Sequence, residues 1–413
     1  MNDDGAINAQ LELPLAGIRV LDFGTTVAGP TAARHLSDYG AEVIKIESEV
    51  HPDTLRVGAP YAEGKPGINR SGYFAVYNAG KLSFALNLRI PESHAILRML
   101  VERSDIVIET FRPGVMDRWG IGYEQMREWN PAIIMASHSL QGQWGPRAKH
   151  RGYGQLASAV GGWYELTGMP NAPPMGPYSA YTDFIAWPFL LVAILTALEV
   201  RDVTGVGQRI DHSQVESSIH FLAPLLLDLQ LTGTTYSRRG NREDYAAPNN
   251  AYPCDGDDQW IAITVLDDEQ WRALCDVLER PEWSDDIRFA SPSARIHHAD
   301  DLDVLIAERT RGRHPQELAE TLQARGVAAG VVAKAQDLFE DEQLQHRQLF
   351  RRLDHPEIGS HAVLTSTFHI DGMASGPHRA APLLGEHTHQ VCRDVLGLEE
   401  EEIARYAALG VFY

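Results

Sequence analysis

The chain contains little cysteine. Cys254, Cys275 and Cys392 are the only three in 413 residues, and they are widely spaced, odd in number and without a CxxC pair. This pattern excludes a disulfide framework and a cysteine zinc site, and it favours a reducing compartment. The N-terminus carries two acids and lacks the basic-then-apolar order of a signal peptide, so we expect a cytoplasmic protein.

Basic residues are also scarce. The sequence has 36 Lys+Arg against 56 Asp+Glu, a net charge of −20. We therefore expect no nucleic-acid partner and no attraction to an anionic membrane, and an anionic ligand would need a local basic patch. The only long apolar run, between Asp183 and Glu199, is shorter than the ~20 residues that cross a bilayer, which predicts a buried helix.

Several catalytic signatures are missing. The sequence has no GxGxxG, no GxxxxGK[ST], no HExxH and no GxSxG. A nucleotide fingerprint, a zinc-peptidase motif and a serine-hydrolase elbow are thus absent, and we expect no metal.

What is present is an alternation of strands and helices. GIRVLDF (17–23), TAARHLSDYG (31–40) and EVIKIES (42–48) read as a βαβ unit, and LSFALNL (82–88), a helix over 91–104, DIVIET (105–110) and AIIMASHS (132–139) continue the pattern. This predicts an α/β fold with a large Rossmann-like, doubly wound parallel sheet.

Composition divides the chain into three segments. Residues 1–231 form the large domain, 232–335 a smaller α/β domain, and 336–413 a segment that returns to the large domain. The Gly- and Pro-rich stretch 152–182 predicts a long loop, followed by a helix with Asp183 at its start and Pro188 in or near its first turn.

Possible ligand-binding residues follow the predicted strands. The loop GTTVAGP (24–30) joins a strand to a helix, where an anion could bind, but the sequence alone favours an ordinary turn. Arg112 and Arg118 follow DIVIET and could hold phosphates or lie on a solvated face, and Arg89 follows LSFALNL in the same way. By pattern alone, Asp183 is a helix N-cap or a nucleophile.

Taken together, these motifs resemble the family III CoA-transferases, which include formyl-CoA and carnitine CoA-transferases. The likeness rests on several segments that appear in order along nearly the whole chain: LAGIRVLDFGTTVAGPTAARHLSDYGAEVIKIE, NAGKLS, ETFRPGVMDRWG, GYGQLASAVGGWYELTG, TGVGQRID, GNREDYAAPNNAYPCDGDDQWIAI, APLLGEHT and the C-terminal LGLEEEEIARYAALGV. The resemblance implies a Rossmann-like domain plus a smaller domain, with two chains interlocked as a homodimer.

It also implies an activity. Such enzymes move CoA between an acyl-CoA donor and a carboxylic acid acceptor, through aspartyl anhydride and aspartyl-CoA thioester intermediates and without a metal. The aspartate corresponds to Asp183. The implied CoA-binding positions are Val27, Ala28, Ser48, Leu86, Arg89, Thr110, Phe111, Arg112, Arg118, Arg151 and Tyr153.

The sequence departs from its relatives at informative places. Thr110 stands where relatives often have asparagine, and the glycine-rich loop of formyl-CoA transferases has no counterpart near GNREDYAAP, which argues against formyl and oxalyl substrates. Two alternatives stay open. One is a 2-methylacyl-CoA racemase, although Gly152-Tyr153-Gly154 replaces the GHD triplet that carries its histidine. The other is a noncatalytic CoA-binding subunit.

Overall fold

The computed structural model describes residues 12–413, so the N-terminal segment judged above for a signal peptide lies outside the described residues. The described chain forms two compact units. The first comprises residues up to Tyr164, Gly176–Tyr236 and Gln343–Tyr413, and the second Glu165–Met175 and Ser237–Glu342. The domain boundaries expected from composition stay a prediction.

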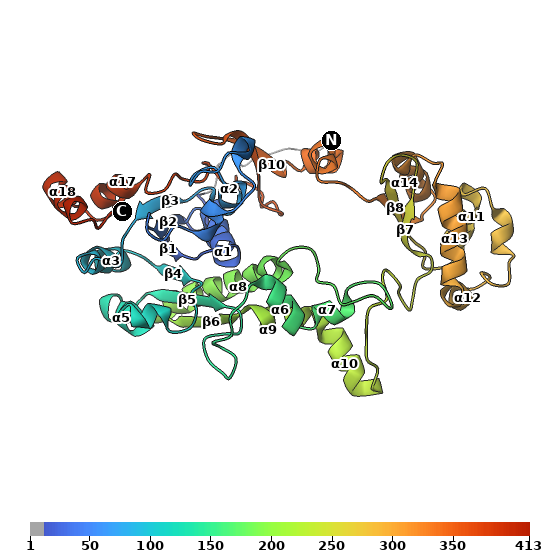
Figure 1. The fold of residues 1–413 in the computed structure, drawn as a ribbon, viewed down its shortest axis with the longest axis horizontal. Coiled ribbons are helices and arrows are strands. Elements are labelled where there is room, and N and C mark those ends of the chain that lie inside the picture. Colours follow the sequence, from blue (N-terminus) through green and yellow to red (C-terminus); the bar gives the residue numbers. More distant parts are fainter. Residues whose placement is uncertain (1–11) are drawn as a thin grey trace. The chain divides into compact units, whose positions relative to one another are not determined.

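A six-stranded parallel sheet organises the first unit. Its order is β3-β2-β1-β4-β5-β6, and every neighbouring pair is parallel. This is the doubly wound order, in which the chain leaves the central strand first toward one edge and then toward the other (Figure 1). The strands are β1 Arg19–Phe23, β2 Glu42–Glu47, β3 Leu82–Ala85, β4 Ile106–Glu109, β5 Ile134–Ser139 and β6 Arg209–Ser213.

Helices and short connections complete this unit. They are α1 Ala28–Asp38, α2 Gly72–Asn78, α3 Ser93–Val101, α4 Val115–Arg118, α5 Tyr123–Trp129, α6 Gly154–Val160, α8 Tyr181–Thr204, α9 Gln214–Ile219, α10 Ala223–Thr232, α17 Thr388–Asp394 and α18 Glu400–Ala408. Two further helices, α7 Trp163–Leu166 and α16 Glu342–His346, span the boundaries between the two units. Short 3₁₀ turns occupy Thr54–Val57, Ala62–Gly64 and His220–Leu222, and the hairpin β10 Phe350–His355 with β11 Gly359–Leu364 stands apart from the sheet.

The sheet is buried on both faces because successive strand side chains point in opposite directions. Leu21 packs with Ile44 and the C-terminal Cys392 and Ile403 in one cluster. Val20, next along β1, packs instead with α1 and with Leu190 of α8. Each such fully buried aliphatic side chain contributes about 1.5–3 kcal/mol of transfer free energy.

Helix α8 differs from the expectation in three ways. It begins at Tyr181, its N-cap is Ala180 without a side-chain hydrogen bond, and Pro188 therefore lies in its interior. Asp183 is thus in the first turn and is not the N-cap. The helix has 24 residues, long and apolar enough to cross a membrane by composition, and a third of its most apolar window is buried in the chain. The buried-helix prediction is therefore right for one face only.

The expected long loop 152–182 also contains structure, since α6 and α7 lie within it. Farther along the chain, the 3₁₀ turn His220–Leu222 separates α9 from α10.

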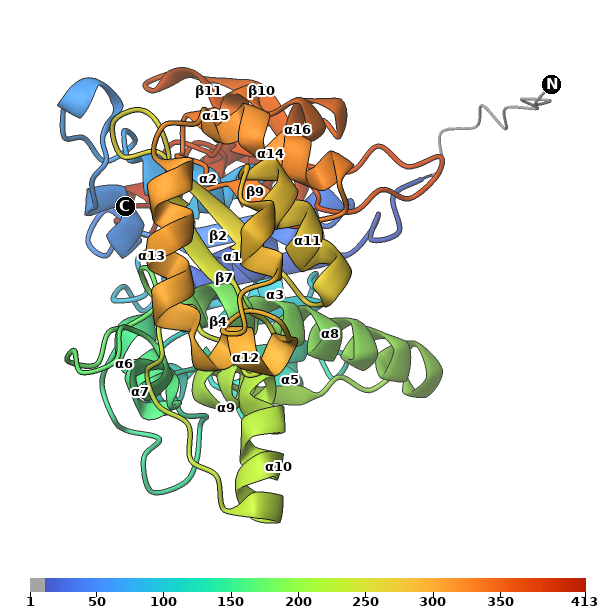
Figure 2. The same cartoon turned by 90° about the vertical axis from the view of Figure 1, so that its right-hand side faces the viewer.

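The second unit is built on a small antiparallel sheet in the order β7-β8-β9. Three helices, α11, α13 and α14, share one hydrophobic core with it, which includes Ile261, Leu274, Leu302 and Leu322 (Figure 2). Its elements are β7 Asn249–Pro253, β8 Trp260–Thr264, α11 Asp268–Val277, a 3₁₀ turn Pro281–Ser284, α12 Pro292–His297, α13 Ala299–Thr310, α14 Pro315–Ala324, β9 Ala328–Val331 and α15 Asp337–Glu340.

Candidate active site

A cavity of about 1090 Å³ lies in the first unit. Its walls come from the segments that follow the carboxyl ends of the sheet strands, the edge at which doubly wound folds bind ligands. Every residue that the sequence and the resemblance marked lines this one cavity: Val27, Ala28, Ser48, Leu86, Arg89, Thr110, Phe111, Arg112, Arg118, Arg151, Tyr153 and Asp183. The structure therefore brings the whole predicted set together, while their contacts to a ligand stay predictions.

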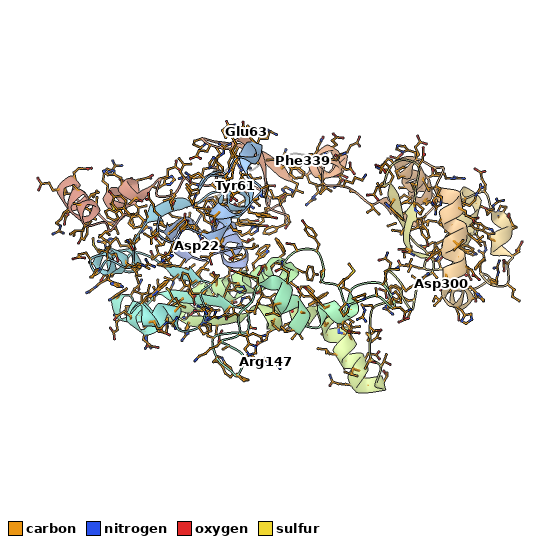
Figure 3. All side chains as sticks on the ribbon, viewed as in Figure 1. Asp22, Tyr61, Glu63, Arg147, Asp300 and Phe339 are labelled. Carbon is orange, nitrogen blue, oxygen red and sulfur yellow. The ribbon has the colours of Figure 1, made fainter. Side chains whose placement is uncertain are left out.

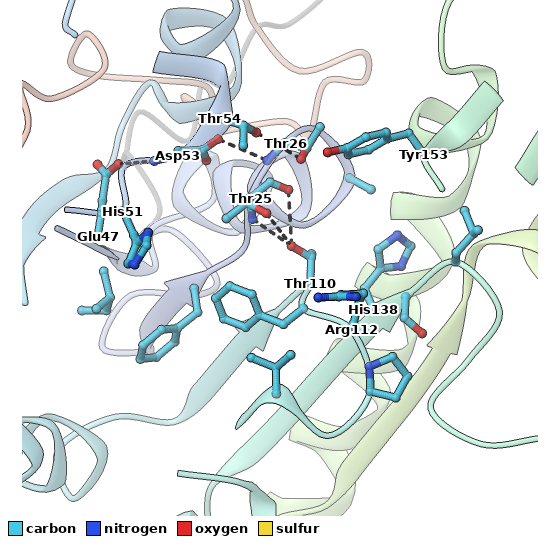
Figure 4. Close-up of a pocket in the computed structure, with 18 of the residues that line it drawn as sticks. Thr25, Thr26, Glu47, His51, Asp53, Thr54, Thr110, Arg112, His138 and Tyr153 are labelled. Carbon is cyan, nitrogen blue, oxygen red and sulfur yellow. Dashed lines mark hydrogen bonds between the residues drawn. The ribbon is translucent and has the colours of Figure 1, made fainter. Parts of the chain in front are cut away.

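The loop between β1 and α1 is held by hydrogen bonds from two sides (Figure 4). Thr25 donates its backbone N–H to the hydroxyl of Thr110 over 2.8 Å, and Thr26 donates its own to Asp53 over 3.2 Å. The Thr110 hydroxyl thus accepts a hydrogen bond from the loop itself. Thr26 has a φ of 69°, a conformation that costs a non-glycine residue energy and that these contacts stabilise.

A buried ionic network lies beneath this loop. Lys45 donates to the Gly24 carbonyl and to Asp53, and Lys81 donates to Asp22 over 2.7 Å (Figure 3 labels Asp22). Burial alone would raise the pKa of Asp22, but Lys45 and Lys81 lower it below its ordinary value. Burial lowers the pKa of Lys81 to about 8. Because losing one member would leave its partner charged and unpaired in the interior, the network fixes the loop firmly.

The cavity wall carries arginines without carboxylate partners. Among residues 12–413, the side chains of Arg112, Arg118 and Arg151 take part in none of the hydrogen bonds or ion pairs within the chain. The one side-chain hydrogen bond of Arg89 in the described part of the chain is with the imidazole of His51. A guanidinium group offers five N–H donors in a planar fork that matches phosphate oxygens. These side chains thus form the local basic patch that an acidic chain needs to bind a polyanion.

Asp183 reaches the cavity from the first turn of α8 and is 8% exposed. Its Oδ1 accepts a hydrogen bond from Nε2 of Gln214, and it accepts another from the backbone N–H of Gly154. Burial raises its pKa from 3.8 to about 6, although both hydrogen bonds act in the opposite direction. A pKa of about 6 leaves the carboxylate ionised at neutral pH, and because neither partner is a cation, its charge is not neutralised by an ion pair.

Gly154 lets the backbone approach this carboxylate. A Cβ atom at residue 154 would lie 2.8 Å from Oδ2 of Asp183 and 2.8 Å from the Ala180 carbonyl oxygen. The glycine carbonyl is fixed as well, because the hydroxyls of Ser158 and Thr182 donate to it over 2.9 and 3.0 Å. The Gly154 backbone is therefore held on both sides, by these hydroxyls at its carbonyl and by Asp183 at its N–H.

Gln214 and His138 are among the polar residues of the cavity wall that sequence reasoning missed. Gln214 directly follows β6 and His138 lies near the end of β5. The rule that pointed to Arg112, a polar residue at the carboxyl end of a sheet strand, applies equally to both.

Comparison with known proteins agrees with this architecture. The sequence profile described as CoA-transferase family III matches residues 15–388. The chain is 33% identical to the succinyl-CoA–D-citramalate CoA-transferase of Chloroflexus aurantiacus over 96% of this chain and 97% of that protein. It is 32% identical to the succinate–glutarate CoA-transferase of Agrobacterium fabrum over 94% of this chain and 96% of that protein. A crystal structure of a CaiB/BaiF family protein from Brucella suis, 30% identical, superposes with a TM-score of 0.85 and covers 94% of this chain and 100% of that one.

Proposed function

Since the chain belongs to CoA-transferase family III, and is thus an enzyme that moves CoA between acyl-CoA thioesters and carboxylic acids, we propose that it does so through covalent intermediates on Asp183. The observation that carries this proposal is the carboxylate itself. It is buried at the wall of a large cavity, is held by two neutral donors, and lacks a cationic partner in the described part of the chain.

The proposed reaction has four steps. A carboxylate oxygen of Asp183 attacks the donor thioester carbonyl, the C–S bond breaks, and CoA leaves as the thiolate with a mixed anhydride behind. The thiolate then attacks the aspartyl carbonyl and releases the donor acid as a carboxylate, which gives an aspartyl-CoA thioester. The acceptor carboxylate attacks this thioester, expels the thiolate and forms a second anhydride. Attack of the thiolate on the acceptor carbonyl yields the new acyl-CoA and restores Asp183.

Burial of Asp183 supports this route. Anhydride and thioester intermediates are lost if water reaches them, and the carboxylate is almost fully shielded by protein. The two donors, Gln214 and the Gly154 amide, hold it in one orientation without neutralising it. No proton needs to move in any of the four steps, which suits a site whose nucleophile is already ionised.

We further propose that the unpaired arginines bind the phosphates of CoA. Arg89, Arg112, Arg118 and Arg151 supply the charge. The apolar and backbone groups of Val27, Ala28, Leu86 and Phe111, together with Ser48, Thr110 and Tyr153, complete the wall along which the rest of CoA lies. A charge-assisted hydrogen bond to phosphate contributes about 1.5–3 kcal/mol.

The names of the relatives guide the choice of substrates. Those relatives are named for succinyl-CoA or succinate and for citramalate and glutarate, all short dicarboxylic acids. We propose acids of this class as donor and acceptor here.

We also propose that two chains form a homodimer. Helix α10 has no buried residue in the described chain although it carries Leu226, Leu227, Leu229 and Leu231. The outer face of α8 exposes Phe189, Val192 and Val203 as well. Apolar surface of this extent indicates a protein partner, and light scattering that gives the mass of a single chain would contradict the proposal.

The covalent step is tested by trapping. The protein is incubated with succinyl-CoA and other acyl-CoAs, treated with hydroxylamine, and digested for mass spectrometry. We expect a hydroxamate on Asp183 that depends on the thioester. The matched control is Asp202→Asn, which changes an exposed acid at the far end of the same helix and should label normally. Modification of another residue, or none with any thioester, would refute the mechanism.

A further inference from the structure

Two histidines on neighbouring strands are in direct contact. The register of β5 with β6 places His138 opposite His212, and their Nδ1 atoms are 2.7 Å apart. Nε2 of His212 lies 2.8 Å from the hydroxyl of Ser217, which in turn lies 3.0 Å from the carbonyl oxygen of Ser213. His138 and Ser217 are each 4% exposed. These contacts form a buried chain that begins at the cavity, since His138 lines it (Figure 4).

The proton positions in this chain follow from counting donors. The Ser213 carbonyl can only accept, so the single hydroxyl proton of Ser217 goes to it. Ser217 must then accept from Nε2–H of His212, and in a neutral imidazole this leaves a lone pair on Nδ1. His138 therefore donates its Nδ1–H to His212. Its own Nε2 is left as a hydrogen-bond acceptor.

Both rings are neutral in this arrangement. Burial lowers the pKa of His138 to about 3 and that of His212 to about 4. A ring that stays neutral across the physiological range keeps the same tautomer, because the Ser217 and Ser213 contacts do not change with pH. In residues 12–413 no protein group is hydrogen-bonded to Nε2 of His138.

We propose that His138 is a substrate-binding residue whose Nε2 accepts a hydrogen bond from an O–H or N–H group of the bound thioester, with His212 and Ser217 as positioning residues that fix its tautomer. This inference rests on the proposed function of the cavity as the acyl-CoA site. The donor has two possible sources. One is an amide N–H of the pantetheine arm, which every acyl-CoA carries, and the other is a hydroxyl on the acyl chain.

If the donor is the acyl hydroxyl, His138 also discriminates between acyl groups. A buried acceptor that meets a donor gains a hydrogen bond, while the same acceptor facing a methylene group loses its contact with water and gains nothing. A site built to pair with a hydroxyl can therefore reject the analogue that lacks it far more strongly than an apolar pocket could.

Binding measurements separate the two sources. In the Asp183→Asn background, which prevents turnover, Kd is measured for free CoA, succinyl-CoA and malyl-CoA, the last two differing by one hydroxyl. His138→Leu removes the acceptor, and His138→Gln restores an acceptor oxygen.

If the pantetheine arm is the donor, we expect the Kd of the His138→Leu protein to rise about tenfold for all three ligands. If the acyl hydroxyl is the donor, only malyl-CoA should lose about tenfold. In either case glutamine should recover part of the loss, and unchanged Kd values for all three ligands in a folded His138→Leu protein would overturn the inference.

The tautomer is tested without changing the chain. Nitrogen-15 spectra of histidine-labelled protein should show His138 as the Nδ1–H tautomer, assigned by the signal that His138→Gln removes, whereas an Nε2–H tautomer or an imidazolium there would contradict the proton assignment. The exposed His346→Gln variant is the control and should leave both the spectrum of His138 and the Kd values unchanged. A wild-type protein that binds no CoA and labels no Asp183 would instead refute the proposed function.

Discussion

Two shielded carboxylates, one in each compact unit, have opposite surroundings. Asp303 in the second unit forms an ion pair with Arg242 at 2.6 Å and accepts hydrogen bonds from Tyr252 and Asn250 at 2.6 and 2.7 Å. Asp183 in the first unit has two neutral donors and no counter-ion in the described structure. Pairing stabilises Asp303 within its fold, whereas the unpaired charge of Asp183 remains available for a reaction.

The arginines repeat this contrast. In the second unit Arg238, Arg239, Arg288, Arg295 and Arg325 all pair with carboxylates. In the first unit Arg112, Arg118 and Arg151 point their charge at a cavity and pair with none of the described acids. Paired charges stabilise the fold, whereas charges without a partner in the protein indicate a site where a ligand of opposite charge binds.

The largest expected effect separates the two carboxylates. Asp183→Asn should lower kcat on the order of 10⁴-fold or more, because the nucleophile is gone, while its thermal midpoint stays at or above that of the wild type. Asp303→Asn should do the reverse. It leaves Arg242 and Tyr252 poorly satisfied at a cost of about 1–3 kcal/mol, yet the folded protein should keep kcat within about twofold. Steady-state kinetics and thermal denaturation of both variants check this, and full activity in Asp183→Asn would remove the basis of the contrast.

The approach of Gly154 to Asp183 gives the next largest effect. In Gly154→Ala the new methyl group meets Asp183 and the Ala180 carbonyl at 2.8 Å, so the carboxylate or the start of α8 must move. A displacement on this scale lowers kcat about 100-fold. Gly312→Ala, in the second unit, is the matched control because a Cβ there meets nothing within 4 Å. Equal activity of the two variants would show that the close approach is unimportant.

The sequence predicted the residues of the cavity wall better than it predicted the hydrogen-bond partners of Asp183. Arg112 and Arg118 could be found because strand alternation implies a parallel sheet, and the ends of its strands must meet at one edge. The same rule covers Gln214 as a residue of the cavity wall, but it could not predict that Gln214 and Gly154 contact Asp183. Gln214 and Gly154 lie 31 and 29 positions away along the chain, and only packing of α8 against α6 and α9 brings them together.

The start of α8 was misjudged for a related reason. Sequence rules place a helix start at a polar cap and keep proline near it. Here Ala180 is the N-cap without a side-chain hydrogen bond, and Pro188 is tolerated in the interior. Burial of Leu190 and Ile194 against the sheet offsets the hydrogen bond that the proline removes.

Removing a cavity arginine should have an intermediate effect. Arg118→Ala should raise KM for the acyl-CoA about ten- to a hundredfold with a smaller change in kcat, since phosphate contacts are made equally in the ground and transition states. Arg325→Ala is the control. It breaks an exposed pair with Asp276 in the second unit, and such pairs contribute at most about 1 kcal/mol to stability and nothing to CoA binding. A similar KM in both variants would mean that the unpaired arginines do not hold the phosphates.

The smallest expected effect is in the pH dependence. Burial raises the pKa of Asp183 to about 6, and only the ionised form attacks a thioester. We therefore expect kcat/KM to be level above pH 7 and to fall about tenfold per pH unit below pH 6.

The stability of the wild-type protein should change with pH in the opposite direction. Because the folded state binds this proton more tightly than the unfolded state, where the pKa is near 3.8, the ionised carboxylate lowers the free energy of unfolding as pH rises from about 4 to 6. Asp183→Asn lacks this proton, so its stability relative to the wild type should increase across that interval. Denaturant unfolding of both proteins at pH 4.5 and 7.5 measures the difference, and a constant difference at the two pH values would show that burial does not raise the pKa of Asp183.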